Sequence, residues 1–265
     1  MNRITKKFRE LSEIRRSALI GYMTAGFPSL DFTGKIVMTM ESSGVDIIEL
    51  GVPFSDPVAD GPVIQRASEY ALRRGITLSG VINFVKGIRK ITEIPVLLMG
   101  YYNPILSYGV EDFVKDASCA GVDGLIVPDL PPEESGELIK HAREYGLATI
   151  FLLAPTSTES RIRAVARVSR GFLYYVSLTG VTGSRSRLPA GIANNIRRIK
   201  RFTNLPVCVG FGVSTPEHVR MLGKVADGVI VGSAIIKIIQ ENRDYRRSIK
   251  NIRRFLSSLH ASIRL

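Results

Sequence analysis

Eight short, almost continuously apolar runs recur along the chain, and amphipathic stretches separate them. Continuous apolar character is typical of parallel strands whose two faces are both buried. In the stretches between them, apolar residues recur at helical spacing. The pattern therefore predicts repeated strand–helix units around a parallel sheet. The predicted strands are 18–25, 46–50, 95–101, 124–128, 148–154, 172–177, 206–212 and 228–233.

The number of units favours a closed barrel over the alternative, an open doubly wound sheet. The chain has 265 residues, a length at which a barrel of eight strands and eight helices forms one domain. We therefore expect an α/β fold, a (β/α)₈ TIM barrel, as a single domain over residues 1–265. A helix over residues 3–15 precedes the first strand and could cover the bottom of the barrel. A short helix follows the eighth strand, in "GSAIIKIIQEN".

Two connections are longer than the usual few residues. One follows the second strand, from Gly51 to Pro62, and the other spans residues 178–191 after the sixth. Both belong at the C-terminal face of a βα barrel, where active sites are built. The second has glycines that can act as hinges, and we expect it to be a lid that trypsin cleaves at Arg185 or Arg187.

Carboxylates stand at the end of the second strand and in the loop after it. Glu49 lies in "IIELG", where a buried carboxylate needs a partner or a raised pKa. Such a group suits acid–base catalysis, and the alternative is a structural carboxylate bonded to backbone amides. Asp60 lies where the loop can reach back over the barrel mouth. Asp56, in "FSDP", is favoured as a turn residue.

Glycines gather at the ends of the late strands, in "GVTG", "GFG" and "GSA". Phosphate sites of barrels form from the loops after the seventh and eighth strands together with the N-terminus of a short extra helix. Glycine lets backbone N–H groups approach a ligand closely, and a helix N-terminus favours an anion. We therefore predict a phosphate site in this corner, with Ser233 as a hydroxyl donor. Because a P-loop lysine is lacking, a nucleoside triphosphate is not expected.

Three aromatic side chains are expected to point to the barrel mouth: Tyr22, Tyr175 and Phe211. With the carboxylates and the phosphate corner, they describe a pocket for a flat apolar group that carries a phosphate tail.

Charge and composition exclude other classes of function. The net charge is +12, but the basic residues fall in stretches with a helical apolar period, as on solvated outer helices. With no nucleic-acid-binding motif, nucleic acid is not an expected partner. Cys119 and Cys208 are expected to be reduced core thiols. The three histidines fall in predicted helices, away from strand ends, which argues against a metal site or a histidine triad. No apolar run is long enough for a membrane span, and we expect a cytoplasmic protein.

Six motifs, in order along residues 5–260, resemble the alpha subunit of tryptophan synthase. They are "LGVPFSDPVADGPVIQRA", "YYNPIL", "GVDGLIVPDLPPEES", "GVTG", "VGFGVS" and "GSAIIKII". The resemblance implies a barrel lyase that cleaves indole-3-glycerol phosphate to indole and glyceraldehyde 3-phosphate. It also implies an α₂β₂ complex, in which a pyridoxal-phosphate β subunit receives the indole and the α chain itself carries no cofactor.

The resemblance also assigns roles to residues. It implies that Glu49 shuttles protons and that Asp60 stabilises charge at the indole N–H, while Pro53 and Asp56 face the β subunit. The implied indole pocket comprises Tyr22, Met99, Ile126, Leu152, Tyr175 and Phe211. The implied phosphate-binding residues are Gly183, Gly212, Gly232 and Ser233, and Thr182 is expected to meet the substrate when the lid closes.

Two other functions fit parts of the pattern. A barrel isomerase acting on a sugar phosphate would need the same glycine-rich corner, although "PFSDPVADGP" argues against it. The chain could also serve only to activate a β partner, and the presence of both Glu49 and Asp60 argues against that alternative.

Overall fold

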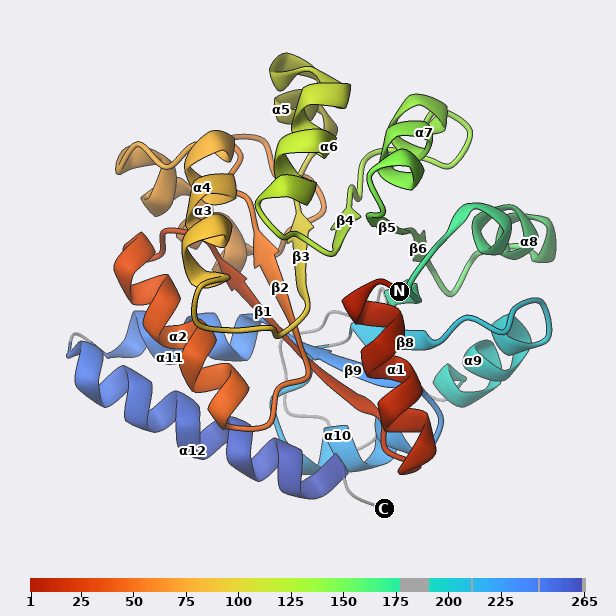
Figure 1. The fold of residues 1–265 in the computed structure, drawn as a ribbon. Coiled ribbons are helices and arrows are strands. Elements are labelled where there is room, and N and C mark those ends of the chain that lie inside the picture. The colour runs from red at the N-terminus through yellow and green to blue at the C-terminus, as the bar shows by residue number, and fades with distance from the viewer. Residues whose placement is uncertain (177–190, 211, 243, 264–265) are drawn as a thin grey trace.

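The computed structural model describes residues 1–176, 191–210, 212–242 and 244–263. Within these residues, nine parallel strands form one sheet with helices around it (Figure 1). The strands are β1 (Ala18–Thr24), β2 (Ile47–Gly51), β3 (Val96–Met99), β4 (Gly124–Ile126), β5 (Ala148–Ile150), β6 (Leu152–Leu153), β7 (Leu173–Val176), β8 (Val207–Gly210) and β9 (Gly228–Val231).

Twelve helices are described. They are α1 (Arg3–Glu13), α2 (Leu30–Ser42), α3 (Pro62–Arg73), α4 (Leu78–Ile88), α5 (Tyr102–Tyr108), α6 (Val110–Cys119), α7 (Gly136–Glu144), α8 (Glu159–Val168), α9 (Ile192–Lys200), α10 (Pro216–Gly223), α11 (Ser233–Glu241) and α12 (Tyr245–Ile263).

The order of the strands shows that the sheet closes on itself. It runs β5-β4-β3-β2-β1-β9-β8-β7-β6, and its two ends, β5 and β6, are separated in the chain only by Phe151. The predicted strand 148–154 is therefore split at Phe151, whose carbonyl accepts a hydrogen bond from the backbone N–H of Tyr174 at 3.1 Å. The prediction of an eight-stranded barrel is confirmed, with the predicted strand 148–154 present as the two short strands β5 and β6.

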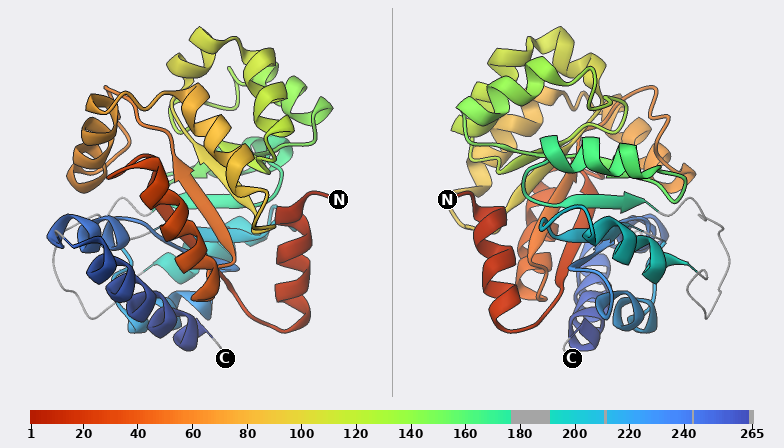
Figure 2. Two further views of the ribbon diagram at one scale, coloured as in Figure 1. Left: turned by 60° about the vertical axis from the view of Figure 1, so that its left-hand side comes forward. Right: turned by 90° about the vertical axis from the view of Figure 1, so that its right-hand side faces the viewer.

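Helix α1 covers the N-terminal end of the barrel, as the sequence predicts. Its apolar residues Ile4, Phe8 and Leu11 are buried and pack on side chains from inside the barrel, including Phe172. Figures 1 and 2 show α1 standing apart from the ring of helices that surrounds the strands. With this end filled, the opposite end, where the strands finish, is left for a site.

Three aspartates that each stand just before a strand make the same pair of bonds to the neighbouring strand. The carboxylate of Asp46 accepts the N–H of Leu19 at 2.8 Å, and the N–H of Asp46 donates to the carbonyl of the same Leu19. Asp123 brackets Val96 in this way, and Asp227 brackets Val207. Because each bracket fixes one register between two parallel strands, these joints hold the sheet together at its N-terminal end.

Each bracketing carboxylate also has a cation beside it. Arg16 bonds Asp46, Arg89 and Arg3 bond Asp123, and Lys200 bonds Asp227. Asp46 and Asp123 are buried, so the guanidinium groups supply the charge that a buried carboxylate needs.

One of the two cysteines differs from the expectation. Both are free, and Cys208 is buried inside the barrel, but Cys119 is exposed at the end of α6. The prediction of a core thiol was therefore wrong for Cys119, because the last turn of α6 turns this position away from the sheet. The three histidines lie in α7, α10 and α12, as predicted.

Candidate active site

Glu49 is the buried carboxylate of the barrel interior. It lies on β2, next to Tyr22 on β1 in the register of the two strands, and the residue is 1% exposed. One of its oxygens, Oε2, has no hydrogen-bond partner among the described residues. Burial, followed by the charge of Asp60, raises the pKa of Glu49 to about 8. At neutral pH the group is therefore mostly protonated and can donate a proton.

Asp60 lies close enough to Glu49 to influence its ionisation. Burial raises the pKa of Asp60 to about 6, although a hydrogen bond from Tyr101 opposes the rise. Asp60 therefore ionises first, and its negative charge then opposes ionisation of Glu49. The loop brings together one carboxylate and one carboxylic acid at neutral pH, which is the division of roles that acid–base chemistry needs.

Interior side chains follow the period of two along each strand, and this decides which residues line the mouth. Ile126 belongs to the interior cluster, and Met99 and Leu152 pack against it, so all three lie inside the barrel. Tyr22 is buried, and burial, followed by the charges of Asp60 and Glu49, holds its pKa well above the ordinary value.

Tyr175 does not face the interior, so the prediction that placed it there was one residue out of register. Its ring is buried in the outer cluster between sheet and helices, and Asn195 of α9 donates a hydrogen bond to its hydroxyl at 2.9 Å. The neighbouring Tyr174 points inward and packs against the interior cluster. Burial, followed by the charge of Glu49, raises its pKa well above the ordinary value. The run "LYYV" is apolar or aromatic throughout, so its sequence does not reveal which tyrosine faces inward.

Two glycines make room for the ring of Tyr22. A Cβ at Gly51 would lie 2.2 Å from the Tyr22 hydroxyl oxygen, and one at Gly232 would lie 3.1 Å from its ring. Tyr22 therefore spans the space between the end of β2, where the carboxylates are, and the end of β9, where the phosphate corner is predicted.

The predicted phosphate corner is only partly described. Gly232 is the residue before α11, and Ser233 is the first residue of that helix, so the predicted short helix after the last strand is present. The first amides of a helix have no intrahelical partner and can bind an anion. Gly212 has a positive φ of 23° and is exposed. Phe211, Thr182, Gly183 and the remaining lid residues up to 190 lie outside the described residues.

The loop after β2 has an inner and an outer side. Pro53 is buried, whereas Asp56 is exposed and its carboxylate accepts a hydrogen bond from Ser55. Asp60 is partly buried and turns inward. Of the two residues expected to face a partner, the structure therefore leaves only Asp56 at the surface.

Tyr101 was not predicted as a site residue, yet it contacts the loop at three places. Its hydroxyl donates to Oδ2 of Asp60 at 3.2 Å and accepts the N–H of Ala59 at 3.0 Å. Its ring stacks on Phe54 with 5.2 Å between centroids. The sequence signals were its place at the end of the third predicted strand, 95–101, and at the start of the motif "YYNPIL".

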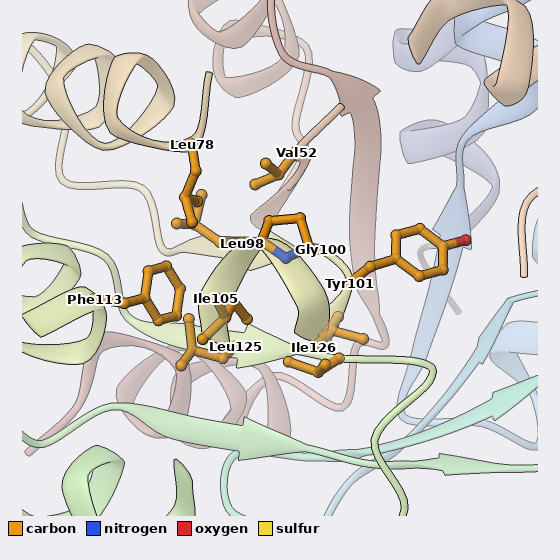
Figure 3. Close-up of a pocket in the computed structure, with 11 residues that line it drawn as sticks. Val52, Leu78, Leu98, Gly100, Tyr101, Ile105, Phe113, Leu125 and Ile126 are labelled. Carbon is orange, nitrogen blue, oxygen red and sulfur yellow. The ribbon is translucent and has the colours of Figure 1, made fainter. Parts of the chain in front are cut away.

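An apolar cavity lies beside the site, between the strands β2 to β4 and the helices α4 to α6. Figure 3 shows that most of its lining side chains are aliphatic or phenylalanine, and that the ring of Tyr101 leaves this group and points away from it. The cavity wall is shared with the site through Ile126 and Tyr101.

In the parts of the chain that are described, no helix is long and apolar enough to cross a membrane.

Comparison with known proteins gives one consistent family. A family model described as "Tryptophan synthase alpha chain" matches residues 8–263. The tryptophan synthase alpha chain of Geotalea daltonii is 51% identical over 241 residues, which cover 91% of each chain. That of Desulfatibacillum aliphaticivorans is 46% identical over 264 residues and covers all of both chains.

Solved structures agree with these relatives. The alpha subunit of tryptophan synthase from Legionella pneumophila is 40% identical, with a TM-score of 0.92, and covers 99% of this chain and 98% of its own. A chain of tryptophan synthase from M. tuberculosis, in an open form with BRD0059 bound, is 36% identical with a TM-score of 0.90 over the whole of both chains.

Proposed function

The chain belongs to the tryptophan synthase alpha chain family, and from that premise we propose how its own residues carry out the family's reaction. The reaction is the cleavage of indole-3-glycerol phosphate to indole and glyceraldehyde 3-phosphate, so the chain is a carbon–carbon lyase of tryptophan biosynthesis. Family membership decides against a sugar-phosphate isomerase and against a chain without chemistry of its own.

Glu49 and Asp60 are the proposed catalytic residues, and their different protonation states carry the proposal. With a pKa of about 8, Glu49 enters the reaction as an acid and protonates C3 of the indole ring. With a pKa of about 6, Asp60 is a carboxylate and stabilises the positive charge that this protonation creates at the indole nitrogen.

The same glutamate then completes the reaction. As a carboxylate, Glu49 removes the proton from the glycerol hydroxyl next to the ring. The bond between C3 and the glycerol carbon breaks, its electron pair returns to the ring, and the hydroxyl carbon becomes the aldehyde. Glu49 ends the cycle protonated, as it began, and the two proton transfers balance without a cofactor in this chain.

The remaining interior side chains would hold the substrate. Tyr22, Met99, Ile126 and Leu152 offer an apolar surface for the indole ring, and we assign Tyr174 to it in place of Tyr175 because Tyr174 faces inward. The first amides of α11, after Gly232, would bind the phosphate together with Ser233, Gly212 and the undescribed Gly183.

The family implies a β-subunit partner. We propose an α₂β₂ complex in which indole passes to a β subunit that carries pyridoxal phosphate. In this proposal, the loop of Asp56 forms part of the contact, because Asp56 is its exposed carboxylate. A cytoplasmic location and a single domain over 1–265 remain predictions.

The test is indole release from indole-3-glycerol phosphate by the full chain, alone and with β subunit. Glu49→Gln should lower the rate by about 10²- to 10⁴-fold, the usual range for lost acid–base catalysis. Affinity for a phosphate-bearing substrate analogue should change little, because the amide keeps the shape of the side chain. Glu69→Gln, an exposed carboxylate on α3, is the control. Wild-type turnover in Glu49→Gln would remove Glu49 from the mechanism.

A further inference from the structure

Tyr101 stands at a junction between the barrel and the catalytic loop. It follows β3 after a single glycine and is the residue before α5. The carboxylate of Asp129 accepts the N–H of Tyr102 at 3.0 Å, which fixes the start of α5 beside it. Tyr101 is 4% exposed. A side chain so placed has a fixed direction, and Figure 3 shows that this direction is away from the apolar cavity.

The hydrogen bonds of its hydroxyl leave one arrangement of the proton. The N–H of Ala59 donates to the Tyr101 oxygen at 3.0 Å, so this contact uses a lone pair. The hydroxyl hydrogen then lies toward Oδ2 of Asp60 at 3.2 Å. A tyrosine hydroxyl has a single hydrogen to donate. The hydrogen bond uses one oxygen of Asp60 and leaves the other oxygen for a substrate N–H.

The rest of the loop is fixed around this contact. The N–H of Asp60 donates to the carbonyl of Pro57 at 3.0 Å, and its own carbonyl accepts from the side chain of Gln65 at 2.9 Å. With the backbone of Asp60 held on both sides, its carboxylate turns mainly by rotation of the side chain. Among the described residues, the hydrogen bond from the Tyr101 hydroxyl is the contact that limits rotation of the Asp60 carboxylate.

We propose that Tyr101 is a positioning residue of the lyase reaction, whose hydroxyl orients the Asp60 carboxylate toward the indole N–H. The inference rests on the proposed function of Asp60. Tyr101 itself does not exchange protons with the substrate, since burial and the neighbouring Asp60 raise its pKa and keep the hydroxyl protonated. It acts by limiting Asp60 to the orientation in which charge stabilisation is strongest.

The electrostatic surroundings of Asp60 predict a further effect. Among the described residues, the titratable groups whose pKa values respond to the charge of Asp60 are Glu49 on β2, Tyr22 on β1, Tyr174 on β7 and Tyr101 itself. Of these, Tyr101 donates a hydrogen bond to the carboxylate and lowers its pKa. Without the hydroxyl, the pKa of Asp60 rises, and the carboxylate forms only at higher pH.

The experiment is the Tyr101→Phe variant of the full chain, assayed for indole release with and without β subunit. The ring and its stacking on Phe54 remain, so the variant differs only in the hydroxyl. We expect kcat to fall about tenfold with little change in KM, the loss expected for one hydrogen bond to a charged group. The acidic limb of the kcat/KM profile should move to higher pH, which a purely structural role would not produce.

Tyr108→Phe is the matched control, because it removes a tyrosine–aspartate hydrogen bond of 2.6 Å, to Asp116, outside the site. Comparing the two variants by thermal unfolding separates a loss of stability from a loss of orientation. A second pair, Asp60→Asn with and without Tyr101→Phe, tests the route of the effect. The hydroxyl should matter little once Asp60 has lost its charge.

Each result decides between the possibilities. Wild-type kcat and an unmoved acidic limb in Tyr101→Phe would overturn the proposal, as would an equal loss of rate in the Asp60→Asn background. If the wild-type chain itself released no indole in either assay, the proposed function would fail, and this outcome is distinct from the failure of Tyr101 alone.

Discussion

Replacing Glu49 by glutamine should make the free energy of unfolding less sensitive to pH. The variant should therefore become more stable relative to the wild type as pH rises. Burial and Asp60 raise the pKa of Glu49 from 4.5 to about 8 in the folded state. The raised pKa means that folding favours the protonated form. The stability this group contributes is fully present below about pH 4.5 and is lost as pH rises through about 8.

The size of the effect follows from the two pKa values. Their difference of about 3.5, at about 1.36 kcal/mol each, amounts to about 5 kcal/mol once pH exceeds 8. Total stabilities of natural domains are only about 5–15 kcal/mol, so the change is measurable. Between pH 5.5 and 8.5, the wild type should lose about 3 kcal/mol relative to Glu49→Gln, whose amide is neutral throughout.

Urea denaturation followed by circular dichroism at pH 5.5, 7 and 8.5 measures this difference. Asp60 titrates in both proteins and with the same sign, so comparing them isolates Glu49 to a first approximation. Glu69→Gln should follow the wild type at every pH. A constant difference between wild type and Glu49→Gln across this range would show that the glutamate is already ionised in the folded state. The proposed role as the initial acid would then have no basis.

Three further changes test other parts of the site and fold. Gly232→Val should raise KM for indole-3-glycerol phosphate at least about tenfold, with a smaller loss of affinity for free indole, because the branched side chain crowds the amides that would bind phosphate. An equal effect on both ligands would make this corner structural. Gly51→Ala should destabilise the fold by about 1–3 kcal/mol in urea denaturation, because its Cβ would overlap the Tyr22 hydroxyl. Adding Tyr22→Leu should restore part of that loss of stability. If the double variant recovered no stability, the overlap would be contradicted. Asp123→Asn should lower the free energy of unfolding by about 3–5 kcal/mol in the same measurement, because it removes the charge between two arginines and weakens the bracket on Val96. A loss of stability below about 1 kcal/mol would show that the bracket contributes little.

The sequence predicts the elements of the barrel well because the strands are apolar on both faces and the helices are amphipathic. It does less well where two neighbouring residues have the same character. In "LYYV", either tyrosine could face inward, and only the period set by the neighbours in space shows that Tyr174 does. The break at Phe151 likewise depends on closure of the sheet, which no local pattern encodes.

The candidate site divides in the same way. Glu49 could be predicted because a carboxylate inside an apolar strand is unusual in itself. Tyr101 could not, because an aromatic residue at a strand end is ordinary until its hydroxyl is seen between Ala59 and Asp60. The lid prediction concerns residues outside the described ranges, so it stays a prediction.

The three aspartate brackets join six of the described strands into three modules of two strands. The bonds from Leu19 to Asp46 and from Val96 to Asp123 each span 27 residues, and the bond from Val207 to Asp227 spans 20. Each bracket therefore closes within one stretch of chain, around β1 and β2, β3 and β4, or β8 and β9. A circular permutant with new ends between β2 and β3 would keep every bracket inside its own module. The quarter-barrel, more than the single strand–helix unit, is the piece from which this chain could be cut and reassembled.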